Sequence, residues 1–364
     1  ETLKAISCLP GLRDLHIEVS HQVALFESLN QLRQLRTLTV IASQNFIMDT
    51  ILRLPSKDLA EIRLGRNERP TGPYQHPVPT QGENKPLFLS IQEQASLGFW
   101  NQCAEVLREK WKDSLTSICI EDLPHTNPLL PLELKPLLMS LYPISNLEEL
   151  KLQNVSYIQP VAISDDDYLN ISTSWPKLRS LELDFPVPNP FDRFSYEELR
   201  LRSMYSSNAT GSIEEDILTV ESLLTLAAKC ERMESLKLYI PSIAFPATWK
   251  DGTLDGLGLP RNFRGNTSLK WLCVGDCDAM EPMLTAAQLN VLFPSLQHVQ
   301  GCCTPSQDMI RPQKGARAPW RWEMVNNALA MIRTARRQER ERLLGLLTEA
   351  GVQVGGQVQR RIYA

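Results

Sequence analysis

The fold of this chain can be predicted from one nine-residue stretch, Trp175-Pro-Lys-Leu-Arg-Ser-Leu-Glu-Leu183. Its three leucines follow the pattern L-x-x-L-x-L, with polar residues between them. In an extended strand alternate side chains point to opposite faces, so Leu181 and Leu183 point one way while Ser180 and Glu182 point the other. Such a strand cannot bury its apolar face alone, but it can when it stacks on neighbours with the same pattern.

The same pattern recurs along the chain. Its eight complete copies are Leu12-Leu15-Ile17, Leu35-Leu38-Val40, Leu59-Ile62-Leu64, Leu115-Ile118-Ile120, Leu147-Leu150-Leu152, Leu178-Leu181-Leu183, Met233-Leu236-Leu238 and Leu269-Leu272-Val274. Leu296 and Val299 give a degenerate ninth copy. The first three copies start 23 and 24 residues apart, and leucine-rich repeats span about 20–29 residues. The alternative, a mixed α/β domain with unrelated strands, leaves the common phase of the copies unexplained.

The pattern therefore predicts an α/β fold, a leucine-rich-repeat solenoid with a curved parallel sheet inside and helices outside. Phe46, Ile47 and Ile51 fall at helical spacing between two strands, as the fold requires. Further helices are predicted at residues 129–141 and 217–229. Proline- and glycine-containing insertions make the repeats irregular at residues 66–86, 184–216, 241–267 and 302–319. Leu87 and Leu89 could belong to a further degenerate strand.

The C-terminal part differs from the repeats. Trp322, Val325, Leu329 and Ile332 share one helical face, and open solenoids need ends that shield their apolar interior. The apolar pattern lapses through the charged run 333–342 and resumes at residues 343–347; residues 352–354 then alternate like a last strand. We predict a solenoid of about nine or more repeats at residues 1–319, by counting the pattern. Residues 320–364 are predicted to form a helical cap and tail.

Composition limits the class of protein. The chain has 364 residues, a net charge of −4 and a hydrophobic fraction of 43%. No apolar run approaches the ~20 residues that span a bilayer, so no membrane association is expected. The eight cysteines lack the spacing of a disulfide framework, which favours reduced thiols and a cytoplasmic or nuclear location.

The sequence carries none of the common motifs for catalysis or cofactor binding. The sequence contains no Walker A motif, no G-x-G-x-x-G, no G-x-S-x-G and no H-E-x-x-H. Cys273 and Cys277 resemble half of a metal site, but no second pair follows at zinc spacing. Asp165, Asp166 and Asp167 could bind a metal or cap a helix, and a helix cap is favoured. The sequence thus predicts a protein that is not an enzyme and has no catalytic residues, cofactor or metal.

A charge asymmetry lies at the C-terminus. From Arg311 to Ala364 there are 11 Lys and Arg against 4 Asp and Glu. Nucleic-acid binding by the helix at 333–342 is one interpretation. The run Arg337-Gln-Glu-Arg-Glu-Arg342 interleaves both signs, however, which favours a solvated helix face over a nucleic-acid site.

Outward strand residues would line the concave face, the surface on which solenoids commonly bind protein partners. Charged and aromatic residues on it are the candidates for partner binding: Glu121, Glu149, Lys151, Glu182, Asp184, Lys237, Tyr239, Trp271 and His298. The other outward positions are Asp14, His16, Thr37, Thr39, Glu61, Arg63, Ser117, Ser180 and Ser235. Tyr239 and Trp271 stand out because large aromatics on a strand face are plausible anchors for a partner.

Four stretches resemble the leucine-rich-repeat part of F-box proteins, particularly the large fungal sets. They are Trp175–Leu183, Ala228-Lys-Cys-Glu-Arg-Met-Glu-Ser-Leu-Lys-Leu238, Ser268-Leu-Lys-Trp-Leu272 and Phe293-Pro-Ser-Leu296, with the Trp322 helix closing the array. The resemblance implies substrate presentation to a cullin-based ubiquitin ligase through a Skp-type adaptor. The F-box motif is not found in residues 1–364, so we expect it upstream if it exists, and no adaptor-binding residue is assigned. The alternative is a leucine-rich-repeat scaffold or regulator unrelated to ubiquitination.

Overall fold

A single parallel sheet runs through the protein. The computed structural model describes residues 9, 11–19, 29, 31–66, 91–121, 132–153, 161–162, 165–184, 220–238, 265–274, 281–301 and 319–349. Within them, nine strands pair in chain order, all parallel. They are β1 (Asp14–Glu18), β2 (Thr37–Ala42), β3 (Glu61–Arg66), β4 (Ser117–Glu121), β6 (Glu149–Gln153), β8 (Ser180–Asp184), β9 (Ser235–Lys237), β10 (Trp271–Cys273) and β11 (His298–Gln300). The α/β class and the parallel sheet predicted from the sequence are confirmed.

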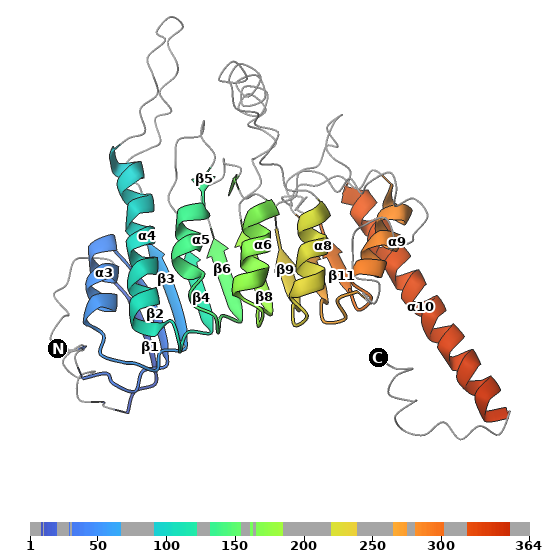
Figure 1. The fold of residues 1–364 in the computed structure, drawn as a ribbon, viewed down its shortest axis with the longest axis horizontal. Coiled ribbons are helices and arrows are strands. Elements are labelled where there is room, and N and C mark those ends of the chain that lie inside the picture. The colour runs from blue at the N-terminus through green and yellow to red at the C-terminus, as the bar shows by residue number, and fades with distance from the viewer. Residues whose placement is uncertain are drawn as a thin grey trace, which may run out of the picture.

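Helices cover one face of this sheet, side by side along its length (Figure 1). The seven helices in the described ranges are α3 (Gln44–Arg53), α4 (Ile91–Trp111), α5 (Lys135–Leu141), α6 (Asp165–Ser174), α8 (Val220–Lys229), α9 (Pro282–Leu292) and α10 (Pro319–Glu349). A separate two-stranded sheet joins β5 (Leu132–Glu133) to β7 (Val161–Ala162). None of the described helices combines the length and apolarity needed to cross a membrane.

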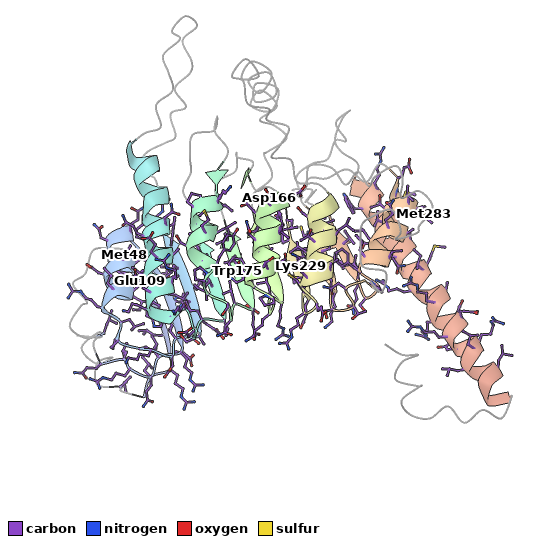
Figure 2. All side chains as sticks on the ribbon, viewed as in Figure 1. Met48, Glu109, Asp166, Trp175, Lys229 and Met283 are labelled. Atoms are coloured by element: carbon purple, nitrogen blue, oxygen red, sulfur yellow. The ribbon has the colours of Figure 1, made fainter. Side chains whose placement is uncertain are left out.

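The second residue of each strand forms a continuous apolar row beneath the helices. In register order the row is Leu15, Leu38, Ile62, Ile118, Leu150, Leu181, Leu236, Leu272 and Val299. Each of these side chains is at most 8% exposed. The alternation predicted from Leu181 and Leu183 is therefore confirmed. Trp175, labelled in Figure 2, is also buried. Its ring centroid lies 5.5 Å from that of Tyr142.

A ladder of backbone hydrogen bonds connects the start of each strand to the start of the next strand in the sheet. The carbonyl of Arg13 accepts the N–H groups of both Arg36 and Thr37, at 2.7 and 2.9 Å. The carbonyl of Arg36 accepts those of Ala60 and Glu61 in the same way. This double acceptance continues through the carbonyls of Ala60, Thr116, Glu148, Arg179, Glu234 and Lys270. Because the geometry recurs eight times, the nine strand entries are structurally equivalent.

Neighbouring helices also satisfy each other's backbone. Lys110 of α4 donates from Nζ to the carbonyls of Ile51, Leu52 and Leu54 at 2.7–2.9 Å, at the C-terminal end of α3. A cation at this end of a helix also complements the helix dipole. Burial lowers the pKa of the Lys110 ammonium.

The C-terminal helix α10 closes the sheet with its first half only. Trp322, Val325 and Leu329 are buried, at 5%, 0% and 1% exposure. The helix predicted around Trp322 is observed. The apolar residues at which the sequence pattern resumes, Leu343 and Leu346, do not take part in this packing. Leu343 and Leu346 are 45% and 49% exposed, because the second half of α10 extends away from the sheet (Figure 1).

Several other predictions change in detail. The helix predicted at 129–141 begins only at Lys135, because Leu132 and Glu133 form β5. The three aspartates 165–167 lie in the first turn of α6, where their negative charges interact favourably with the positive end of the helix dipole. The described residues contain no group of three or more His, Cys, Asp or Glu that could hold a metal ion. Cys277, Tyr239, the Leu87–Leu89 strand, the strand at 352–354 and nearly all of the four insertions lie outside the described residues.

Candidate partner-binding site

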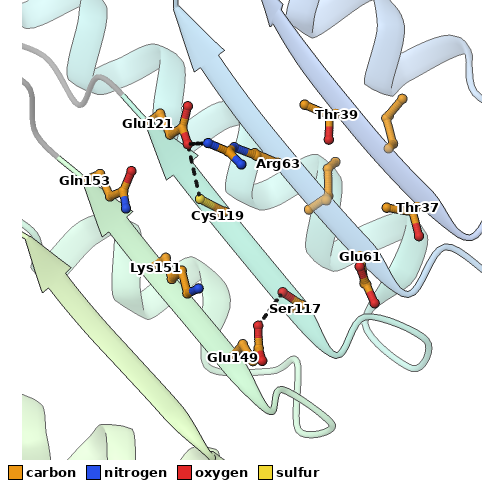
Figure 3. Close-up of a pocket in the computed structure, with 12 residues that line it drawn as sticks. Thr37, Thr39, Glu61, Arg63, Ser117, Cys119, Glu121, Glu149, Lys151 and Gln153 are labelled. Carbon is orange, nitrogen blue, oxygen red and sulfur yellow. Dashed lines mark hydrogen bonds and ion pairs between the residues drawn. The ribbon is translucent and has the colours of Figure 1, made fainter. Parts of the chain in front are cut away.

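The face of the sheet opposite the helices, here called the open face, carries a hollow of about 300 Å³. The hollow lies over β2, β3, β4 and β6 (Figure 3). Its lining side chains are mostly polar or charged: Thr37, Thr39, Glu61, Arg63, Ser117, Cys119, Glu121, Glu149, Lys151 and Gln153, with Leu38 and Ile62 beneath. This surface has the polar character of a recognition site.

Parallel register arranges these side chains in two rows that run across the strands. The acidic row consists of Thr37, Glu61, Ser117 and Glu149, the first residues of their strands. The basic row consists of Thr39, Arg63, Cys119 and Lys151, two residues further along. Neighbouring strands lie about 4.8 Å apart, and residues two apart on a strand are separated by roughly 6.6 Å. The rows therefore define a fixed grid of side chains.

Arg63 and Glu121 form an ion pair across β3 and β4 (Figure 3). The Cys119 thiol donates to the same carboxylate, with Sγ 3.8 Å from Oε1. Burial, and then the charge of Glu121, raise the pKa of the Cys119 thiol to about 11, although Arg63 and Lys151 act in the opposite direction. At pH 7 the Cys119 side chain is therefore a neutral thiol. It lines the hollow as a polar group and not as a nucleophile, because only the thiolate is nucleophilic.

The remaining charges of the hollow are not neutralised by one another. Ser117 Oγ donates to Glu149 Oε2 over a long 3.4 Å, while Glu61 is exposed. Within the described part of the chain, Lys151 Nζ has no hydrogen bond or ion pair. Its register neighbour Glu182 instead accepts Lys237 Nζ at 3.3 Å.

The structure divides the predicted binding residues into two places. Glu121, Glu149 and Lys151 line the hollow, and the Glu182–Lys237 pair lies beside it. Trp271 and His298 are register neighbours on β10 and β11, toward the C-terminal end of the sheet. Glu149 and Trp271 belong to the same cross-strand row but are three strand spacings apart, about 14 Å at the usual separation.

Two predicted residues give no further information about the site. Asp184 ends β8, where it is the register partner of Gln153, but its side chain lies outside the described set. Tyr239 lies outside the described residues altogether. The side chain of Trp271 is partly buried, and its interpretation as an anchor stays a prediction.

Sequence reasoning misses two residues of the hollow, Cys119 and Gln153. Cys119 lies midway between Ser117 and Glu121, so the alternation of the strand places it on the open face. Gln153 follows Lys151 by two residues and faces the same way. Applying the period to every residue, whatever its polarity, would have found both.

No protein-family model matches the chain, and no curated protein matches it. Function is therefore inferred from the residues of the open face and their geometry. The surface offers both signs of charge, hydroxyl groups and a shallow hollow, which together suit recognition of another polar molecule.

Proposed function

We propose that the chain is a leucine-rich-repeat solenoid whose open face binds a protein partner. The in-order parallel sheet, the L-x-x-L-x-L strands and the recurring carbonyl ladder support the repeat assignment. The observation that carries the binding role is the hollow over β2–β6, in which Glu61, Glu149 and Lys151 lack ion-pair partners among the described residues. Charges without ion-pair partners are well suited to select a complementary surface, and Lys151 is also partly buried.

The lining favours binding over catalysis. The lining holds one thiol, Cys119, and its pKa is raised to about 11, first of all by burial. The described lining contains no histidine that could act as its base. Activated thiols have a depressed pKa, whereas the pKa of this thiol is raised, so its hydrogen bond to the Glu121 carboxylate does not make it a nucleophile at neutral pH.

We further propose that the bound protein is presented to a ubiquitin ligase. This part rests on the resemblance of Trp175–Leu183 and three related stretches to F-box leucine-rich-repeat proteins. A scaffold or regulator outside ubiquitination would use the same open face, so an experiment must separate the two roles.

The test is affinity purification of the full natural protein from its own cells, with quantitative mass spectrometry of the associated proteins. The open-face variant combines Glu149→Lys with Lys151→Glu, which preserves net charge. The control variant combines Glu109→Lys with Lys229→Glu on the helix-covered side (Figure 2). A partner enriched with the wild type and the control but lost with the open-face variant is expected.

The two parts of the proposal fail separately. An unchanged set of associated proteins in the open-face variant would place binding elsewhere. A Skp-type adaptor is expected with all three proteins, and the partner is expected to accumulate when cullin activity is blocked. If the adaptor is missing while the partner is captured, the ligase role is rejected and the scaffold role remains.

A further inference from the structure

Several charges at the starts of the later strands are paired within the protein. Along the edge where strands begin, Arg179 lies 2.6 Å from a Glu234 oxygen and 3.8 Å from Glu148. Lys270 approaches the other Glu234 oxygen at 3.8 Å. The hydrogen bond from Arg179 lowers the pKa of Glu234. These exposed pairs already satisfy one another, so they offer a partner little.

The acidic row of the hollow differs from this edge. Glu61 and Glu149 flank Ser117 on strands two spacings apart, about 10 Å between their Cα atoms. Neither carboxylate has an ion-pair partner among the described residues. A long cationic side chain placed over Ser117 would lie between the two carboxylates.

The basic row supplies the opposite charge at one position. Arg63 is occupied by Glu121, so its charge is largely cancelled. Lys151 remains, half-buried between Cys119 and Glu182, and Glu182 is engaged by Lys237. After these pairings, two carboxylates and one ammonium group of the hollow are left for a partner.

We propose that the hollow selects an extended protein segment that carries a basic and an acidic side chain two residues apart. The Lys or Arg of the segment lies over Ser117 between Glu61 and Glu149, and its Asp or Glu pairs with Lys151. Side chains at positions i and i+2 of an extended chain lie on one face, roughly 6.6 Å apart. Ser117 and Lys151 lie one strand and two residues apart, roughly 8 Å between their Cα atoms, which the long side chains of such a segment can span.

This inference rests on the proposed function and specifies its partner. Charge complementarity of this kind contributes mainly to specificity and to the register of binding. A segment with only basic side chains would be repelled by Lys151. A segment with only acidic side chains would be repelled by Glu61 and Glu149. The grid therefore discriminates by the presence of both signs of charge and by their spacing.

The test is selection of a library of random 12-residue displayed peptides on the immobilised full chain. With the wild type, we expect enrichment of basic-x-acidic or acidic-x-basic triplets, since either chain direction fits the grid. Lys151→Glu should abolish the preference for the acidic residue and keep the basic one. Glu61→Gln with Glu149→Gln should abolish the basic preference. Lys229→Glu, on the covered side, should leave the selection unchanged.

A selected peptide is then measured by fluorescence anisotropy. Lys151→Glu is expected to weaken its binding about tenfold, and more at low salt than at high salt. Enriched peptides that carry one sign of charge, or a pattern that Lys151→Glu does not change, overturn the inference. Failure to enrich any peptide also overturns the inference. The proposed function is rejected by a different result, which is that the open-face variant still captures the natural partner.

Discussion

Asn326 of α10 pairs with both backbone polar groups of Val299 in the last strand, β11. Its Oδ1 accepts the Val299 N–H at 2.8 Å, and its Nδ2 donates to the Val299 carbonyl at 2.7 Å. An edge strand presents unpaired N–H and C=O groups that invite another chain to pair with it. The asparagine amide, which has one donor and one acceptor side, occupies the place that a tenth strand would take.

Asn326→Ala should therefore destabilise the C-terminal end of the protein. Two hydrogen bonds to a part-buried backbone are lost, and an unsatisfied buried group costs about 1–3 kcal/mol. Hydrogen exchange of the Val299 amide should accelerate, and the urea midpoint should fall. Asn327→Ala, at the exposed neighbouring position, is the control and should change neither. Equal exchange rates in the two variants would contradict the role of Asn326.

Two glycines near the C-terminus should respond oppositely to alanine. A Cβ at Gly301 would clash with the indole of Trp322, so that side chain must move. Gly301→Ala should lower the melting temperature and expose Trp322, as a red shift of its fluorescence. A Cβ at Gly345 meets nothing within 4 Å, and alanine is favoured over glycine in a helix by about 1 kcal/mol. Gly345→Ala should raise the helix content, and a loss there would contradict the helical assignment.

The same leucine-to-alanine change should cost more in the centre of the sheet than at its edge. Leu181 lies in central β8 at 0% exposure, whereas Leu15 lies in edge strand β1 at 8%. Leu181→Ala should reduce the free energy of unfolding by roughly 2–5 kcal/mol, since the cavity has neighbours on both sides. Leu15→Ala should cost less, because the edge can relax. Denaturant titration of both variants measures the difference, and the reverse order would be incompatible with the apolar row.

The Cys119 thiol should react slowly with iodoacetamide at neutral pH. Its pKa is raised from 9.0 to about 11, so the thiolate is scarce below pH 9 and increases as pH rises toward 11. Glu121→Gln removes an anion that raises this pKa, and the rate at pH 8 should increase. Lys151→Met removes a cation that lowers it, and the rate should decrease. Site-resolved mass spectrometry follows Cys119 separately, and an unchanged rate in both variants would refute the electrostatic coupling.

The strands and the buried row were predictable because a two-residue period fixes which side each residue faces. Leu181 and Leu183 are buried while Glu182 remains partly exposed, as that period requires. The location of the hollow was not predictable from the pattern. The character of the hollow depends on which outward charges form ion pairs with one another. Arg63 and Glu121, which form such a pair, are 58 positions apart in the sequence and are brought together by the pairing of β3 with β4.

The sequence pattern also does not show how much of α10 packs against the sheet. Its apolar residues at 343 and 346 have helical spacing, but the sheet ends at β11 and offers them no surface. Similarly, Trp271 and Glu149 both face outward, yet the three strand spacings from β6 to β10 separate two possible contact areas. Periodicity reports the direction of a side chain, whereas position along the sheet depends on how many strands precede it.

The carbonyl ladder has a consequence for how the protein could be altered by insertion. Consecutive acceptor carbonyls, from Arg13 to Lys270, are separated by 23 to 56 residues, yet each accepts the same two N–H groups. The distance along the chain between two strand entries is thus independent of their distance in space. Foreign sequence grafted between such entries, for example after Arg66, should leave the neighbouring strands in register. The scaffold could then carry exchangeable loops, as an adaptable framework for engineered recognition.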